Sequence, residues 1–213
     1  MRRRQGGFGL LELTLALAIG LMLLAAASQL FASGLQTWRL QSTAVRMQDE
    51  ARSALLRMAQ DIRMAGMFGC LRLRPGDFAH SAAQQAFARP LEVDASTLSL
   101  VVAELPGQAG APDWFVHTNC TSEVFVNDQR EGDHPLVYGI SKYVYKLEGE
   151  TLKFKRRGSF QPLVENVLEM RIERVKTPTG ERLDIALTLY EPRLDIRQHH
   201  ALSVATRNPV LPP

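Results

Sequence analysis

The stretch that decides the fold is Gly6-Gly7-Phe8-Gly9-Leu10-Leu11-Glu12, which opens an almost unbroken apolar run that continues to Ala27. Three arginines, Arg2 to Arg4, precede the run and would hold that end in the cytoplasm. A helix that crosses a bilayer needs about 20 apolar residues. A carboxylate at bilayer depth costs about 2.5–3.5 kcal/mol on insertion scales and usually marks function. The sequence therefore predicts a membrane-spanning N-terminal helix in which Glu12 has a function.

The order of basic leader, Gly7, Phe8, three residues, Glu12 and apolar helix resembles the type IV prepilin signature, which pilins share with type II secretion pseudopilins. The resemblance implies cleavage after Gly7 by the prepilin peptidase and N-methylation of the new terminus, Phe8. It also implies that Glu12 is the assembly carboxylate of the family. One position departs from the pattern, because Gly9 stands where the family usually has Thr or Ser.

Two other interpretations of the N-terminus compete with the prepilin. A secretory signal peptide would have Leu13–Leu24 as its apolar core and Ala25-Ala26-Ala27 as its cleavage site. A plain signal anchor would keep the whole run uncleaved. A glutamate at the head of the run is unusual for both, and neither explains the Gly7-Phe8 junction.

The composition is that of an ordinary globular protein, with 46% hydrophobic and 22% charged residues among 213. The net charge of +3 is matched by the three arginines of the leader, so it is poor evidence for nucleic-acid binding. The two cysteines, Cys70 and Cys120, would lie outside the cytoplasm, where disulfides persist. We expect them to be bonded to each other, and the alternative is two buried free thiols.

A second helical pattern follows the apolar run. No proline occurs before Pro75, so one helix can extend from Phe8 to about Ala65. Apolar residues recur there at spacings of three and four, and most charged residues lie off this stripe. The stripe consists of Leu40, Ala44, Met47, Ala51, Leu55, Met58, Ile62 and Ala65. We expect it to pack on a sheet of the same chain. A free coiled coil is disfavoured, because the stripe is rich in alanine and lacks sustained Leu or Ile.

The end of this helix carries a second resemblance. Gly66 and Gly69 are helix stop signals. The residues Asp61-Ile62-Arg63, Ala65-Gly66 and Gly69-Cys70 are similar to the Asp-x-Arg-x-Ala-Gly-x-x-Gly-Cys stretch of PilW-type minor pilins. This resemblance implies a structural subunit, without catalytic activity or cofactor, that helps to start or cap a pilus. Its implied partners are other minor pilins, the major pilin, the inner-membrane assembly platform and the lipid bilayer.

The rest of the chain is predicted to form a β domain. Residues 71–113 are expected to be a loop with one strand, Thr97–Ala103. Further strands are expected at 114–117, 122–126, 138–146, 151–154, 165–175 and 182–189, with turns at Glu148-Gly149-Glu150 and Thr177-Pro178-Thr179-Gly180. Leucine and isoleucine alternate with other residues in 182–189, which predicts a half-buried strand. Residues 208–213 are expected to be a frayed tail.

No arrangement of residues indicates catalysis. The histidines lack a His-Glu-x-x-His spacing, and the chain has no Gly-x-Ser-x-Gly or phosphate loop. His199-His200 could bind a metal but is expected to be a solvated pair. Asp128, Glu131 and Asp133 could offer oxygen ligands to Ca²⁺, but their spacing does not fit an EF-hand, and a solvated loop is expected.

A short basic patch is the remaining candidate. Its residues are Lys153, Lys155, Arg156 and Arg157, interleaved with Phe154 and Phe160. Basic and aromatic side chains together can hold single-stranded DNA. The preferred explanation is an exposed strand edge that lysine protects from pairing, so nucleic acid is not an expected partner.

Together these observations predict an α+β, pilin-like fold, in which a long N-terminal helix, half membrane-spanning and half amphipathic, packs on an antiparallel β-sheet. The expected segments are a leader at 1–7, the membrane half of the helix at 8–34, its amphipathic half at 35–66, a periplasmic β domain at 67–207 and a tail at 208–213. The expected location is the inner membrane of a Gram-negative bacterium, with incorporation into the pilus. The alternatives are a type II secretion pseudopilin and a membrane-tethered periplasmic module that binds DNA or another ligand.

Overall fold

The computed structural model describes residues 9–105, 110–130, 135–178 and 180–208. Its first element is the helix α1, Leu10–Met64, which confirms the long N-terminal helix predicted from the absence of proline. The chain divides into two units, Met1–Arg46 and Met47–Pro213, so α1 contributes residues to both. Each unit is described by itself.

In the first unit, α1 exposes its apolar side chains. Between Leu10 and Leu24 the large hydrophobic residues are exposed by 50% (Ile19) to 83% (Leu10). Among the described residues, α1 is the one helix long and apolar enough to cross a membrane. The hydroxyls of Thr14 and Ser28 each donate to the carbonyl three residues earlier, at 3.0 and 2.8 Å. Polar groups satisfied within the helix are what a lipid environment requires, so this segment suits a bilayer or a bundle of apolar helices.

The second unit contains the last turns of α1 and a domain built mainly from strands. The elements that follow α1 in the described residues are η1 (Pro75–Asp77), α2 (Ser81–Ala88), β1 (Leu91–Asp94), β2 (Thr97–Ala103), β3 (Trp114–Thr118), β4 (Val124–Asn127), β5 (Leu136–Glu148), β6 (Thr151–Lys155), β7 (Gln161–Val164), β8 (Val167–Thr177), β9 (Gly180–Glu191) and β10 (Ile196–Ala205). They form a seven-stranded sheet and a three-stranded sheet, and all the pairings between these strands are antiparallel.

The long strand β5 organises the larger sheet. β2 pairs with residues 140–146 of β5, while β3 and β6 pair with residues 136–140 and 144–148. β1 continues the sheet beyond β2, β4 continues it beyond β3, and β7 continues it beyond β6. The turn between β5 and β6 contains Gly149 at a φ of 62°. Glycine adopts this left-handed conformation readily, which agrees with the turn predicted at this position.

The smaller sheet has the order β10-β9-β8. Its central strand β9 shows the alternation predicted from the sequence, because Leu183, Ile185, Leu187 and Leu189 are each at most 1% exposed. The residues between them are half-buried on the other face. One face of the sheet is therefore committed to the core.

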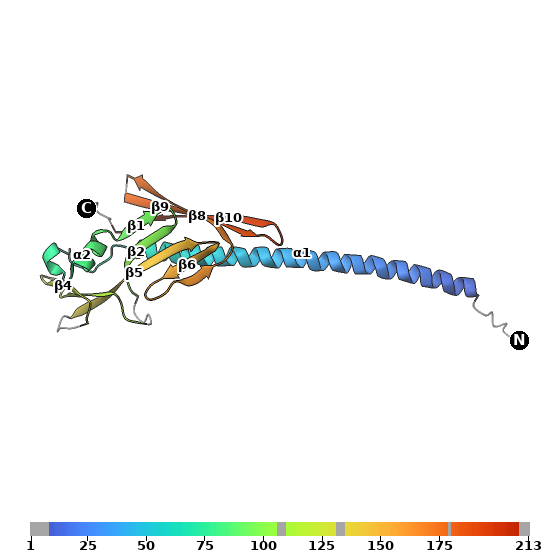
Figure 1. Ribbon diagram of the computed structural model, residues 1–213, viewed down its shortest axis with the longest axis horizontal. Coiled ribbons are helices and arrows are strands. Elements are labelled where there is room, and N and C mark those ends of the chain that lie inside the picture. Colours follow the sequence, from blue (N-terminus) through green and yellow to red (C-terminus); the bar gives the residue numbers. More distant parts are fainter. Residues whose placement is uncertain (1–8, 106–109, 131–134, 179, 209–213) are drawn as a thin grey trace. The chain divides into compact units, whose positions relative to one another are not determined.

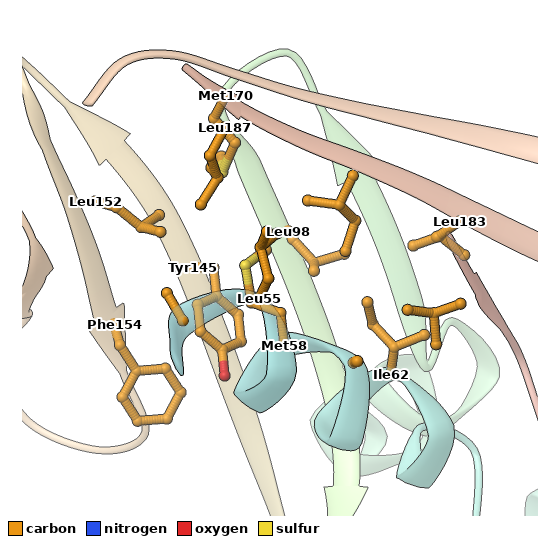
Figure 2. Close-up of a cluster of buried hydrophobic side chains, with 14 of the residues drawn as sticks. Leu55, Met58, Ile62, Leu98, Tyr145, Leu152, Phe154, Met170, Leu183 and Leu187 are labelled. Carbon is orange, nitrogen blue, oxygen red and sulfur yellow. The ribbon is translucent and has the colours of Figure 1, made fainter. Parts of the chain in front are cut away.

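The larger core joins the last turns of α1 to strands of both sheets (Figure 1). Figure 2 shows Leu55, Met58 and Ile62 of α1 beside Leu98 and Leu183 of the two sheets. From Met47 onward every residue of the predicted stripe is at most 5% exposed; these residues are Met47, Ala51, Leu55, Met58, Ile62 and Ala65. Burying one large aliphatic side chain stabilises a fold by about 1.5–3 kcal/mol. The amphipathic end of α1 therefore packs on sheets of its own chain, as predicted.

A smaller core lies on the opposite face of β2. Val101 and Ala103 pack there with Phe87 of α2, and the ring of Phe87 contacts the rings of Phe68 and Trp114 at centroid distances of 4.3 and 5.6 Å. The alternate residues of β2 that belong to the α1 core are Leu98, Leu100 and Val102. Both faces of β2 are therefore covered, which explains the nearly continuous apolar sequence of this strand.

Seven strands agree with the predicted ones within a few residues, and β2 agrees at both ends. The predicted loop before it is wrong, because α2 and β1 occupy part of residues 71–96. Besides β1, two further strands are absent from the prediction, β7 and β10. Pro162 lies inside β7, and proline normally argues against a strand. Arg197, His199 and His200 interrupt the apolar pattern of β10.

Candidate functional site

The first turn of α1 places Glu12 at the head of the apolar run. The carbonyl of Gly9 accepts the backbone N–H groups of Glu12 at 3.0 Å and Leu13 at 3.2 Å, which starts the helix immediately after the glycine. A carboxylate in the first turn interacts favourably with the positive end of the helix dipole. The unusual glycine is therefore compatible with a regular helix start, since it stands just outside the helix rather than in its interior.

The carboxylate of Glu12 has no ion-pair partner in the part of the chain that the structure describes. The predicted cleavage and methylation residues, Gly7 and Phe8, lie outside the described residues. A single carboxylate among exposed apolar side chains is unfavourable in lipid. A cation from another chain would offset that cost, so this turn is chemically suited to ion pairing between subunits.

Residues 2–28 match the prokaryotic N-terminal methylation motif. This prepilin-type motif, together with the fold, shows that the chain is a protein like the type IV pilins and pseudopilins. Pilins are structural proteins rather than enzymes, and their motif implies processing by the prepilin peptidase followed by pilus assembly. The apolar helix is consistent with anchoring in the inner membrane. In comparisons with curated proteins and with solved structures, none matches the chain.

In this pilin-like protein, Asp61 fastens the end of α1 to the central strand of the larger sheet. The hydroxyl of Tyr145 on β5 donates to Asp61 Oδ2 at 2.5 Å. Burial raises the pKa of the Asp61 carboxyl, while the Tyr145 hydrogen bond and the Arg57 charge partly oppose that rise. Burial and the adjacent carboxylate raise the pKa of Tyr145, so its hydroxyl stays protonated and donates.

An aromatic contact extends this junction. The Arg57 guanidinium lies over the ring of Phe154, with Cζ 3.9 Å from the ring centroid. The ring of Phe154 in turn lies 4.9 Å from that of Tyr145 (Figure 2). A cation over an aromatic face is attractive, so β5 and β6 both hold the same two turns of α1.

Two glycines take the chain from α1 into the β domain. Gly66 has a φ of 74° and Gly69 a φ of 111°, both in the left-handed region that disfavours other residues. Between the helix end and this turn, Ala65 forms an isolated antiparallel bridge with Val102, and the N–H of Gly66 donates to the carbonyl of Val101 at 3.1 Å. The residues directly after α1 therefore bond to β2. The left-handed backbone at positions 66 and 69 explains why glycine stands at both places in the Asp61–Cys70 stretch.

Asn208 also caps this end of the helix. Its side-chain Nδ2 donates to the carbonyl of Ala65 at 3.0 Å, across 143 residues of sequence. The sequence predicts that 208 begins a frayed tail, but at this residue the structure shows an anchored side chain. Residues 209–213 lie outside the described residues.

Cys70 and Cys120 are joined in a disulfide, with their Cα atoms 5.5 Å apart. The bond ties the segment after α1 to the loop between β3 and β4. Cys120 has a φ of 59°, and its N–H donates to Thr118 Oγ1 at 3.0 Å. The side-chain oxygen of Asn119 accepts the backbone N–H groups of Thr121, Ser122 and Glu123, each at 3.0 Å. Local side-chain hydrogen bonds therefore hold this cysteine in its unusual conformation.

The basic patch on β6 is largely paired. Arg156 Nη2 lies 2.5 Å from Glu104 Oε1, and Lys153 Nζ lies 3.0 Å from Glu148 Oε2. Phe154 is buried, so it offers no stacking surface. The explanation of an exposed strand edge is wrong, because β6 lies between β5 and β7. Among the described residues, the patch therefore offers fewer free cations and exposed rings than the sequence suggests, and single-stranded DNA requires both.

The other candidates from the sequence are the histidine pair and the acidic loop, both considered as metal sites. His199 lies 3.3 Å from Thr188 Oγ1, and His200 lies 3.0 Å from Gln198 Oε1, both on β10. Burial and the neighbouring His199 lower the pKa of His200. Asp128 is exposed, whereas Glu131 and Asp133 lie outside the described residues. Among the described residues, no three His, Cys, Asp or Glu side chains gather as a metal site would need.

Two residues of the junction were missed by sequence reasoning. Tyr145 lies in a predicted strand, and nothing local in the sequence connects it with Asp61. Asn208 stands next to Pro209 and has the composition of a tail. The turn at Asn119 can be predicted from the sequence, because asparagine side chains often accept hydrogen bonds from the backbone two or more residues further on.

Proposed function

We propose that this protein is a minor pilin of the PilW type, a structural subunit that takes part in starting or capping a type IV pilus. One observation supports this role most directly. The same helix exposes a long apolar surface within residues 10–46 and buries its last turns in a folded domain. Such a chain presents a helix for packing against other apolar helices, while its own domain remains folded.

Processing and assembly follow from that architecture. The prepilin peptidase cuts between Gly7 and Phe8, and the new N-terminus is methylated. The amine of Phe8 is then a cation next to the apolar phase. In a fibre, the amine of one subunit pairs with Glu12 of a neighbour that is offset along the axis, and the pair neutralises two charges that lipid disfavours.

The PilW-type assignment is supported by the stretch from Asp61 to Cys70. Four of its residues have separate structural roles: Asp61 accepts the Tyr145 hydroxyl, Gly66 and Gly69 adopt left-handed conformations, and Cys70 forms the disulfide. Each of these residues meets a structural requirement of the junction between α1 and the sheet. This argues against a chance similarity to the PilW-type stretch. The β domain would then lie in the periplasm, and other minor pilins and the major pilin would be its partners.

The experiment is deletion of the gene and complementation in its own host. We expect the deletion to reduce surface pili and twitching motility, and the tagged protein to appear in sheared pilus fractions. A type II secretion pseudopilin is the alternative that shares the helix and the leader. Normal pili together with loss of secreted exoproteins would favour the pseudopilin and contradict the minor pilin.

A further inference from the structure

A cavity of about 580 Å³ opens beside the segment that follows α1. Its volume lies within the range of about 300–1,000 Å³ that is usual for ligand sites. Phe68, Phe78 and Phe87 line it, and their rings pack on one another with centroids 4.3 and 5.3 Å apart. Pro90 and the end of α2 close another part of the wall. The interior is therefore aromatic and suited to an apolar side chain.

The charged residues of the cavity wall have one sign. Arg72 and Arg74 contribute to it, and no aspartate or glutamate does so among the described residues. Neither guanidinium has an ion-pair partner in the described part of the chain. The nearby Asp77 carboxylate accepts the backbone N–H of Arg74 at 2.7 Å. Two arginines at an apolar cavity favour a ligand that carries a carboxylate, because guanidinium groups bind carboxylates through paired hydrogen bonds.

The backbone along the cavity is available for hydrogen bonding. The N–H of Met67 donates to Met64, and that of Arg74 donates to Asp77. Between them, the structure describes no hydrogen bond that involves the backbone of residues 68–73. Extended peptides are recognised by main-chain hydrogen bonds together with pockets for side chains. This stretch offers both, which favours a peptide over a ligand without main-chain amides.

We propose that the cavity binds a short extended segment of another protein, one that carries an aromatic or aliphatic side chain close to a carboxylate. The apolar side chain enters between the phenylalanines, the carboxylate pairs with Arg72 and Arg74, and the segment's backbone bonds to residues 68–73. The site does not depend on the pilus role, since it is formed entirely by the second unit.

The test uses the full chain in lipid nanodiscs and the peptide acetyl-Gly-Phe-Val-Glu-Gly-amide with 4-fluorophenylalanine in place of phenylalanine. Fluorine NMR line broadening reports binding. One matched peptide replaces the glutamate by glutamine. The other replaces the phenylalanine and the valine by alanines and carries the fluorine on its acetyl cap. We expect binding of the first peptide, and at least about fivefold weaker binding of each matched peptide. Equal broadening by all three peptides, or none by the first, overturns the proposal.

Two variants place the binding in this cavity. Arg72→Ala/Arg74→Ala should weaken binding about fivefold or more, whereas Lys176→Ala/Arg193→Ala, which removes two exposed cations elsewhere, should not. Ala88→Trp adds bulk at the cavity wall and should abolish binding, while Ala82→Trp on the exposed side of α2 should leave it intact. Equal loss in the control variants indicates non-specific attraction and contradicts the site. If a variant truncated after Asn208 binds the first peptide more strongly, residues 209–213 compete for the cavity, and this outcome also supports the proposal.

Discussion

The hydroxyl of Tyr145 lies 2.5 Å from a carboxylate oxygen of Asp61, and this contact joins the end of α1 to β5 across 84 residues of sequence. An apolar stripe alone would stay buried if α1 were shifted along its axis over the sheet. The hydrogen bond between Tyr145 and Asp61, within the same contact surface, forms at only one position of the helix. We infer that this pair fixes the position of α1 on the sheet.

Tyr145→Phe should lower the free energy of unfolding by about 1–3 kcal/mol, because it leaves a largely buried carboxylate without its donor. The measurement is urea unfolding of the full chain in a non-ionic detergent, followed by near-UV circular dichroism. The control is Tyr190→Phe, whose hydroxyl bonds Asp195 in an exposed place at 3.1 Å, and its effect should stay within about 0.5 kcal/mol. Equal effects of the two substitutions would contradict the role of the pair.

The same carboxyl should give the fold a pH dependence. Burial raises the pKa of Asp61 above its ordinary value of 3.8, so the native state holds this proton at pH values where the unfolded chain has released it. The resulting stabilisation is complete below the unfolded pKa, and it is lost as the pH rises through the native pKa.

Asp61→Asn removes that titration. As the pH rises above 3.8, the free energy of unfolding should therefore fall more steeply in the natural chain than in the variant. The difference between the two slopes isolates this residue from other titrating groups. Parallel curves would show that Asp61 has no raised pKa in the native protein.

The disulfide should contribute substantially to stability. It closes a loop of 50 residues, for which chain entropy gives an upper value of about 4 kcal/mol. Cys70→Ser/Cys120→Ser should lower the free energy of unfolding by up to a few kcal/mol, and reduction of the natural chain should give the same loss. If oxidised and reduced protein unfold at the same urea concentration, the bond does not stabilise the domain.

The sequence revealed most of the elements whose pattern is local. The period of the α1 stripe and the alternation in Leu183–Leu189 each follow from one element, and both agree with the structure. Strands that form because a neighbouring strand pairs with them, against their own sequence pattern, are not apparent from the sequence. β7 forms although it contains Pro162, because β6 provides its pairing partner. β10 pairs along its own whole length with residues 182–191 of β9 in spite of its polar residues.

The sequence predicts the N-terminal motif of the candidate site but not the contacts at the end of α1. Gly7, Phe8 and Glu12 form a sequence motif, and motifs can be found without coordinates. The contacts of Tyr145 and Asn208 with the end of α1 join residues 84 and 143 positions apart, and no local pattern indicates them. The pairing of Arg156 with Glu104, which occupies one cation of the basic patch, is equally hidden from the sequence.

Glu12→Leu should leave membrane insertion intact or improve it, because the substitution removes a charge from an apolar segment. It should impair incorporation into pili, because the neighbouring amine loses its partner. Membrane fractionation and immunodetection in sheared pili measure the two effects separately. Thr14→Leu changes a residue of the same helix without removing a charge and should be incorporated normally. Normal incorporation of Glu12→Leu would show that this carboxylate is not the assembly contact.

The central claim is that this chain is processed as a prepilin and keeps its apolar helix. N-terminal mass analysis of the mature protein, purified from membranes of its own host, tests it most directly. We predict a mature chain that begins at Phe8 and carries one methyl group on its amine. A mature chain that begins at Ser28 would show cleavage by a secretory signal peptidase and contradict the account, as would an intact N-terminus at Met1.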